Sequence, residues 1–400
     1  MTLTQGSCPH ATLYQEWDAV PGGAQVTEVG GHWLVSSHAL VRQVLTDAET
    51  FSPDNALDAV TPMSTKALRI LTQHGFRLPH TLANNATPSH PGLRAVVSDF
   101  LAPARVNEQR GFVTDFVRAR VAAAGEALDR GEQVDLHATI SHALPLVTLA
   151  RLIALPGDDV DVVKRFSASA LELFWAPLDS RRQVELAGIV GEYHARLRAF
   201  ARTGPGLAAT LRAHSADNNV DEDDVVAVLF FLLVAGQETT SQFLTALLHR
   251  LATTPEITRG ILDGSVAVPD VAAEGLRTDT SVVTWRRVAT RDTELGGVRI
   301  PAGASVVLRL AAAGRDPAIV AAPGEFVPGQ RGSRRHLSFG AGLHRCLGAH
   351  LATMEAEAVV AESARLLARC RVVRPPSHAD NLSFRMPDAF VVEASQPGAA

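Results

Sequence analysis

The sequence FGAGLHRCLG at residues 339–348 is the most informative stretch of the chain. Its glycines at positions 340 and 342 allow a sharp turn and a close approach of the backbone to a bound group. Cys346 lies directly before a long predicted helix that ends at about Ala368, so free amide groups and the positive dipole end face its sulfur. Gly348 would let that helix lie against a flat ligand. The pattern predicts a thiolate at the start of the helix.

Two simpler interpretations of this stretch stay open on the residues alone. Cys346 could be a buried structural cysteine that follows a glycine-rich turn, because free cysteines are often buried. Alternatively, His344, Cys346 and His350 could bind zinc, although a clear fourth ligand and the usual paired cysteine spacing are lacking.

A second informative stretch lies inside a long apolar helix that the sequence predicts from Asp221 to Thr254. Four acidic residues at 221–224 favour a helix N-terminus, and the residues that follow are apolar on every side as far as Ala235. Pro255 ends the pattern. One continuous helix of roughly 30 residues would be about 45 Å long and would cross the molecule.

The middle of this helix contains the sequence AGQETT at residues 235–240. Ala235 and Gly236 remove side-chain bulk at a point where a flat ring and a small bound molecule would need room. Glu238 and Thr239 place an acid and an alcohol in apolar surroundings, which is costly unless the groups are satisfied or used. The pair indicates either a site that handles protons or the polar cap of a kink inside the helix.

Together, these two stretches resemble the cysteine loop and the distal motif of the cytochrome P-450 family, and the resemblance extends over nearly the whole chain. It implies a mainly α-helical fold with small β-sheets, a single domain over residues 1–400, and haem b between the long helix and the cysteine loop. It also implies that Cys346 is the axial thiolate and the metal ligand. Glu238 and Thr239 would relay the protons that accompany heterolytic cleavage of the O–O bond.

Other haem contacts are implied by the same resemblance. The residues at positions that bind the two propionates are His90, Arg94, Arg287 and His344. The residues expected along the ring are Ala235, Gly236, Phe339 and Gly348. For His90 and Arg94, four residues apart on a predicted helix, a solvated helix face is the simpler alternative.

Glu274 and Arg277 lie three residues apart, a spacing that is common in surface ion pairs of helices. The resemblance instead implies a buried pair that Arg331 joins. We interpret this trio as structural support behind the cysteine loop.

The substrate pocket is expected on the haem face opposite Cys346. Its candidate walls are Leu233, Val234, Val283, Thr284, Trp285 and Phe384. Gly314 and Ser281 stand where the family commonly has Asn and Pro, which leaves the substrate class open. An aromatic content of 5% favours an aliphatic lining.

The resemblance implies a soluble, bacterial-type haem-thiolate monooxygenase that acts with dioxygen on a small organic substrate, in secondary metabolism. No glycine-rich nucleotide-binding fingerprint is present, so electrons from NAD(P)H are expected to arrive through a ferredoxin and its reductase. Arg334, Arg335 and Arg345 would form a basic landing patch, or else ordinary solvated side chains. The alternatives are a peroxide-driven haem-thiolate enzyme, which commonly lacks the acid–alcohol pair, and a non-catalytic haem-binding protein.

Composition limits the class of protein. The 400 residues are 46% hydrophobic and 20% charged with a net charge of −5, which argues against a disordered chain and a nucleic-acid binder. The three cysteines, Cys8, Cys346 and Cys370, form no disulfide framework and fit a reducing compartment. No signal peptide is visible, and the longest apolar run, 225–236, is short for a bilayer. A cytoplasmic monomer without a membrane anchor is expected.

The chain is organised as a β-rich N-terminal part at about 20–60, a helical core at about 91–280, and the cysteine loop with the last long helix at 336–368. Val26–Val29 and His32–Val35 are expected to pair as a hairpin across Gly30-Gly31. A second β-like region, with a tight turn at Gly296-Gly297, lies between 288 and 310.

Overall fold

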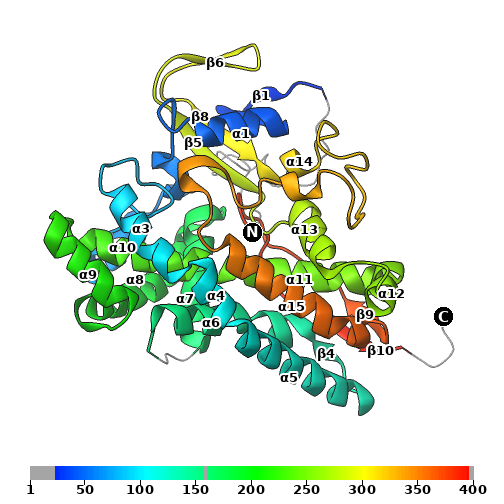
Figure 1. The fold of residues 1–400 in the computed structure, drawn as a ribbon. Coiled ribbons are helices and arrows are strands. Elements are labelled where there is room, and N and C mark those ends of the chain that lie inside the picture. Colours follow the sequence, from blue (N-terminus) through cyan, green and yellow to red (C-terminus); the bar gives the residue numbers. More distant parts are fainter. Residues whose placement is uncertain (1–22, 157–159, 396–400) are drawn as a thin grey trace.

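The structure is a computed structural model that describes residues 23–156 and 160–395. Cys8 and the N-terminal residues on which the absence of a signal peptide was judged lie outside these ranges. Helices form the larger part of the molecule, and a small sheet with α1 and α14 lies at one end of it (Figure 1). The expectation of a mainly α-helical fold with small sheets is confirmed.

The helices follow the proline and glycine signals of the sequence closely. Pro103 and Pro145 each lie in the first turn of a helix, where a missing amide hydrogen costs nothing. The α-helices are α1 (His38–Thr46), α2 (Thr65–Gln73), α3 (His90–Phe100), α4 (Pro103–Glu108), α5 (Arg110–Asp129), α6 (Leu144–Ile153), α7 (Val160–Trp175), α8 (Ser180–Thr203), α9 (Leu207–Asn218), α10 (Glu222–Ala235), α11 (Glu238–Thr253), α12 (Pro255–Asp263), α13 (Val268–Thr278), α14 (Leu310–Gly314) and α15 (Ala349–Leu367). Shorter helical turns are η1 (Asp54–Leu57), the π-helix η2 (His137–Ser141), η3 (Ser333–Arg335) and η4 (Gly342–His344).

Whereas the tight turn at Gly296-Gly297 forms a separate hairpin, the N-terminal hairpin and the last part of the second expected β region join into one sheet. Its order is β1-β2-β8-β5-β3, in which β2 and β8 are parallel and the other neighbours are antiparallel. These strands are β1 (Val26–Val29), β2 (His32–Val35), β3 (Phe51–Ser52), β5 (Thr284–Ala289) and β8 (Ser305–Arg309). The hairpin β6 (Thr293–Leu295) and β7 (Val298–Ile300) stands beside it, and β4 (Val134–Asp135), β10 (Val391–Ala394) and β9 (Cys370–Arg374) form a third sheet.

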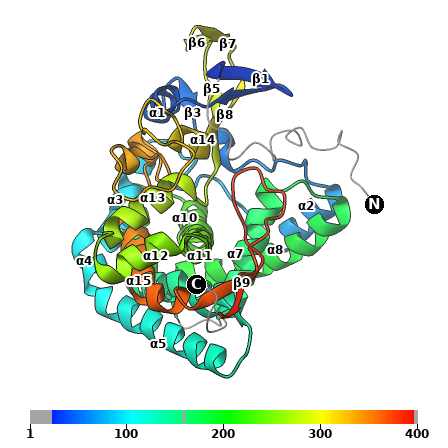
Figure 2. The same cartoon turned by 90° about the vertical axis from the view of Figure 1, so that its right-hand side faces the viewer.

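The prediction of one uninterrupted helix from Asp221 to Thr254 is wrong. The helix is broken between α10 and α11 at Gly236-Gln237. The carbonyl of Leu233, which would accept from the amide of Gln237 in a regular helix, accepts from Ser167 Oγ at 3.1 Å and from Gln237 Nε2 at 3.0 Å instead. Side chains therefore compete with the helix ladder at the same place as the AGQETT motif. Figure 2 shows α11 in the middle of the helical part.

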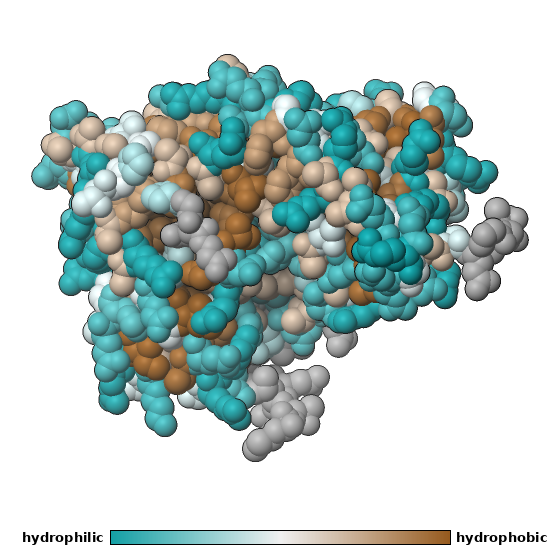
Figure 3. Space-filling model, turned by 90° about the horizontal axis from the view of Figure 1, so that it is seen from below, coloured by the Kyte–Doolittle hydropathy of each residue, from teal (hydrophilic) through white to brown (hydrophobic). Residues whose placement is uncertain are grey.

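The α10–α11 pair is also the one stretch of the described residues, Glu222–Thr253, that is long and apolar enough to cross a membrane. In this fold 67% of its most apolar window is buried by α7, α8, α13 and α15 among others, as expected of the core helix of a globular protein. On the outer face seen in Figure 3, apolar patches are interrupted by hydrophilic side chains.

Candidate functional site

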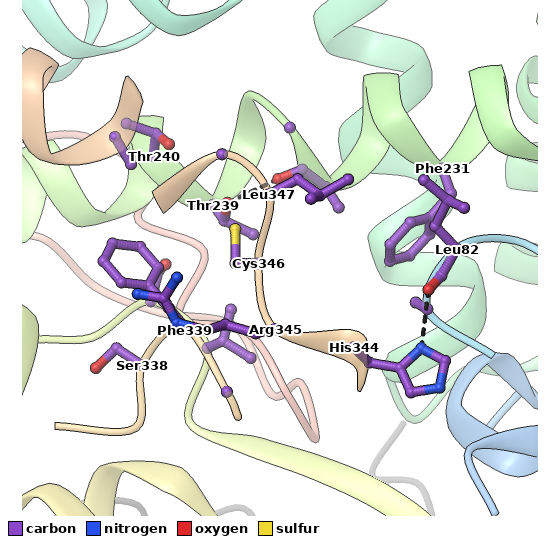
Figure 4. A pocket seen from close by; sticks show the side chains of 18 of the residues that line it. Leu82, Phe231, Thr239, Thr240, Ser338, Phe339, His344, Arg345, Cys346 and Leu347 are labelled. Carbon is purple, nitrogen blue, oxygen red and sulfur yellow. Dashed lines mark hydrogen bonds between the residues drawn. The ribbon is translucent and has the colours of Figure 1, made fainter. Parts of the chain in front are cut away.

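A largely apolar pocket lies between the broken α10–α11 helix and the loop that precedes α15 (Figure 4). Cys346, Phe339 and Gly348 contribute to it from the loop side. Ala235, Gly236, Thr239 and Thr240 contribute to it from the broken helix. The two motifs that the sequence singled out, about 100 residues apart, therefore line one cavity.

Cys346 is fixed in this pocket by the turn before it. Its backbone amide donates to Phe339 O at 2.9 Å, and its sulfur points toward Thr239 in Figure 4. The exposed surface of the side chain is pocket surface, and burial away from bulk water raises the pKa of the Cys346 thiol. The amide of Gly348 and the charges of Arg345 and Arg94 act in the opposite direction and favour the thiolate.

Two glycines shape the turn before Cys346. Gly340 and Gly342 have φ angles of 64° and 69°, in the left-handed region. A Cβ on Gly342 would also lie 2.7 Å from Leu45 O, whereas a Cβ on Gly340 would meet nothing within 4 Å.

These two glycines give a matched pair of variants. Gly342→Ala is expected to lower the free energy of unfolding by about 1–3 kcal/mol more than Gly340→Ala, because both strain φ but only Gly342 also clashes with a backbone carbonyl. Denaturant unfolding of both variants measures the difference. Equal losses would show that the contact with Leu45 is relieved without cost.

Two histidines meet at the edge of the pocket. His344 Nδ1 and His90 Nε2 lie 3.0 and 3.3 Å from the same carbonyl, Leu82 O, and their ring centroids are 4.6 Å apart. Burial lowers the pKa of both, to about 4 for His344. His90 is only 1% exposed, so a solvated helix face is wrong for this residue.

Two arginines complete this edge, and both line the pocket. Arg287 is 1% exposed, donates to Arg286 O at 2.8 Å, and has its pKa lowered to about 10 by burial. Arg94 donates to Arg345 O at 2.5 Å and so connects α3 to the cysteine loop. The four sequence-predicted residues for propionate binding thus lie together.

The distal motif combines a helix break with a hydroxyl group. Thr239 Oγ1 donates to Ala235 O at 2.7 Å, so its oxygen retains acceptor capacity on the pocket side. A Cβ on Gly236 would lie 2.4 Å from Leu232 O and 3.1 Å from Leu149 Cδ2, and no larger residue fits there without movement. Thr239 therefore caps the break, as one interpretation expected, and also lines the pocket.

Glu238 does not line the pocket but pairs with a lysine that the sequence did not single out. Lys164 Nζ on α7 lies 2.9 Å from Glu238 Oε1 and donates to Gln237 Oε1 at 2.7 Å. Lys164 is 2% exposed, and burial lowers its pKa while Glu238 raises it. The one signal in the sequence is that Lys164 lies on the buried face of the amphipathic helix α7. It precedes its partner Glu238 by 74 positions.

The support behind the cysteine loop differs from the expected trio. Glu274 and Arg277 form a fully buried ion pair at 2.6 Å, but Arg331 is exposed and takes no part in it. Gln330 Nε2 at 2.7 Å and Ser333 Oγ at 2.6 Å donate to Glu274 instead. The prediction that Arg331 joins the buried pair is therefore wrong, because Gln330 and Ser333 occupy the hydrogen-bonding positions at the Glu274 carboxylate.

The expected substrate walls also need correction. Trp285 and Phe384 line the pocket, whereas Leu233, Val234, Val283 and Thr284 do not. The pocket side of α10 carries residues at i, i+3, i+4 and i+7, and strand β5 alternates so that its pocket positions are 285 and 287. The residues of α10 on this side are Val228, Phe231, Leu232 and Ala235.

The three arginines of the expected basic patch have different surroundings. Arg345 lines the pocket, and Arg334 donates to Asp270 at 2.9 Å, which offsets its charge. The zinc alternative fails as well: His344 and His350 bind Leu82 O and Asn107 Oδ1, and within the described ranges no three His, Cys, Asp or Glu residues are arranged to hold a metal.

Comparison with known proteins gives one consistent family. The sequence profile of cytochrome P-450 matches residues 268–397. Cytochrome P-450 BJ-3 from Bradyrhizobium diazoefficiens is 30% identical over 297 residues, which are 70% of this chain and 69% of that protein. Erythromycin C-12 hydroxylase from Saccharopolyspora erythraea is 28% identical over 350 residues, which are 84% of this chain and 83% of that protein.

Solved structures agree with these relatives. The structure of cytochrome P-450 CREJ in complex with (4-ethylphenyl) dihydrogen phosphate has a TM-score of 0.85 at 30% identity and covers 91% of this chain and 92% of that chain. Membership of this family implies a haem cofactor, dioxygen and an organic substrate. The chain therefore belongs to the cytochrome P-450 family and is an oxidoreductase, a cytochrome P-450 monooxygenase.

Proposed function

We propose that this monooxygenase inserts one atom of dioxygen into a small, uncharged organic molecule, with Cys346 as the axial ligand of a haem bound in the pocket. The observation that carries the proposal is that Cys346 and Thr239 face one pocket from two different elements. When bound, the haem supplies the iron-centred activation of dioxygen. The remaining chemistry depends on side chains of this chain.

The pocket edge fits a group with two carboxylates. His90 Nδ1, His344 Nε2 and Arg287 Nε are buried and have no hydrogen-bond partner among residues 23–156 and 160–395. Carboxylate oxygens would accept from Arg287 Nε, and from His90 Nδ1 and His344 Nε2 once those imidazoles are protonated, with the cation Arg94 beside them. His90, Arg94, Arg287 and His344 would therefore hold the haem propionates, while Ala235, Gly236, Phe339 and Gly348 flank the ring.

Thr239 and Glu238 would manage protons on the other side of the pocket. The Thr239 hydroxyl lines the pocket and is oriented by its bond to Ala235 O. Glu238 is the adjacent residue and would renew the proton on the Thr239 hydroxyl. Its carboxylate pairs with Lys164 and does not line the pocket.

The substrate side of the pocket favours an apolar molecule. Phe231, Trp285 and Phe384 supply aromatic walls, and Val228 and Leu232 supply aliphatic ones. Thr240, Thr280 and Ser281 add hydroxyl groups without charge. Trp285 is held by stacking on Trp175, with ring centroids 6.2 Å apart, so this wall is rigid.

Electrons are proposed to come from NAD(P)H through a ferredoxin and its reductase, in the cytoplasm of a bacterium and in secondary metabolism. Arg335 and Arg345 are exposed residues near the cysteine loop that an acidic partner could contact. A monomeric enzyme over residues 1–400 is part of this proposal.

Thr239→Ala tests the proposed reaction. The variant is expected to consume dioxygen but to form at least about tenfold less product per dioxygen, because the hydroxyl that delivers the proton is gone. Thr253→Ala is the matched control, since Thr253 is an exposed threonine on the same helix whose hydroxyl donates to the backbone carbonyls of His249 and Arg250. The measurement is product and peroxide formed per dioxygen consumed, with a substrate found by spectral titration.

If Thr239→Ala keeps the wild-type ratio of product to dioxygen, proton delivery through Thr239 is wrong. If peroxide alone supports turnover as well as dioxygen with reductant does, a peroxide-driven enzyme replaces the proposal. If no substrate is turned over although haem binds, the chain is a non-catalytic haem-binding protein.

A further inference from the structure

The face of α11 that turns away from the pocket is polar and buried. Because an α-helix has 3.6 residues per turn, Glu238, Ser241, Gln242 and Thr245 share one face, while the pocket-lining Thr239, Thr240 and Phe243 lie on another. Each of the four polar residues is at most 7% exposed. We call these four residues, together with the groups packed against them, the polar seam.

The seam ends at the π-helix η2. His137 Nδ1 lies 2.8 Å from Thr245 Oγ1, and the ring of His142, just after η2, contacts His137 with centroids 5.5 Å apart. Both histidines are only half-buried, so each reaches solvent. π-helices are uncommon and are frequently found at functional sites.

Several atoms in the seam lack partners. Ser241 Oγ and both amide atoms of Gln242 on α11, Ser141 Oγ on η2 and Glu355 Oε1 on α15 are buried and find no hydrogen-bond partner within the described part of the chain. Buried polar groups of native proteins are nearly always satisfied, by internal water where protein atoms are missing. The seam therefore calls for a row of internal water molecules beside Glu238.

Charged and titratable groups surround the seam. Glu238 and Lys164 both interact electrostatically with His137 and His142. Asp135 and Asp161 also face the histidines, and Glu355 faces Lys164.

Protonation states favour transfer. Burial lowers the pKa of His137 to about 4 and lowers that of His142, so the imidazoles are largely neutral at pH 7 and can both accept and donate. Burial raises the pKa of Glu355 to about 8, so this carboxyl holds a proton at pH 7.

We propose that the polar seam is the proton-uptake route of this enzyme, in which a proton enters from solvent at His142 and His137 and travels through internal water along Ser241, Gln242 and Thr245 to Glu238. The proposal rests on the proposed function, because it supplies the proton that Thr239 delivers. His137 and His142 act through Glu238 and are positioning residues.

A readout that needs no turnover comes first. A high-resolution crystal structure of the haem-loaded enzyme is expected to contain ordered water within hydrogen-bond distance of Ser241 Oγ, the Gln242 amide and Glu238. A dry seam, with these side chains satisfied by one another, would overturn the route.

Solvent isotope effects then test the histidines. His142→Leu and the double variant His137→Leu with His142→Leu are expected to slow product formation at least about tenfold and to raise its H2O/D2O rate ratio, because proton uptake becomes limiting. His142→Gln, which retains a polar side chain, should lie between them and the wild type. His194→Leu is the control: His194 is also buried, with its pKa lowered by burial, but it lies on α8 against Phe76.

Wild-type rates and isotope ratios in the histidine variants would overturn the seam proposal even if Thr239→Ala still loses product per dioxygen. Failure of the Thr239→Ala experiment would instead overturn the proposed function. The two failures are therefore distinguishable.

Discussion

Arg277→Met is expected to lower the free energy of unfolding by about 3–5 kcal/mol, because it leaves a fully buried carboxylate without its counter-charge. That loss is a large part of the about 5–15 kcal/mol by which a domain is usually stable. Arg277 also donates to Gly314 O, Pro323 O and Glu325 O, so the change frees three carbonyl groups in the segment before the cysteine loop. Denaturant unfolding measures the effect.

Arg334→Met is the matched control. This substitution removes an arginine from a largely exposed ion pair with Asp270. The free energy of unfolding is expected to fall by only about 0–1 kcal/mol. The double variant Arg277→Met with Glu274→Gln should recover part of the stability because no buried charge is left. An Arg277→Met protein as stable as the wild type would contradict the role given to this pair.

The same cluster predicts a dependence of stability on pH. Burial would raise the pKa of Glu274, but hydrogen bonds from Arg277, Ser333, Val327 and Gln330 prevail and lower it below the ordinary 4.5. The stabilisation is therefore complete above about pH 4.5 and is lost as the pH falls through the lower folded pKa. The acid-induced loss should be smaller in the double variant.

Lys164→Met should have the second large effect, on catalysis. Without Lys164, the buried Glu238 carboxylate loses its counter-charge. We expect product formation to fall by at least about 10²-fold, the contribution of a general acid–base group, with a changed pH profile and a raised solvent isotope effect. The variant should still bind haem with a thiolate-type spectrum, because Lys164 does not line the pocket.

Lys66→Met, at an exposed position of α2, is the control for loss of a lysine. If Lys164→Met lowers thermal stability but leaves the pH profile and isotope effect as in the wild type, Lys164 is only structural. Wild-type turnover in this variant would show that the ion pair is not needed for proton delivery.

Local signals in the sequence were sufficient for much of the fold and for the core of the site. A glycine pair indicates the hairpin β1–β2, and the acidic N-cap and first turn indicate the start of α10, because turns and caps depend on neighbouring residues. The cysteine loop is recognisable because its turn glycines and the start of the following helix are both encoded by adjacent residues.

The errors came from features that depend on tertiary packing. α10 is apolar on every side, so no amphipathic pattern distinguishes the pocket-lining Phe231 and Leu232 from Leu233 and Val234, which do not line the pocket. The helix break depends on Ser167, 66 residues away from the carbonyl that it contacts. No residue near Glu238 in the sequence indicates that Lys164 is its partner.

The most direct test of the account is the visible spectrum of the reduced protein under carbon monoxide. Haem ligated by the sulfur of Cys346 should give a thiolate-type Soret band in the wild type and in Cys370→Ala, because the half-buried Cys370 does not line the pocket and its thiol donates to Leu366 O. Cys346→Ala should lack the band. A wild-type protein without it, or a Cys346→Ala protein that retains it, would contradict the assignment on which every other role depends.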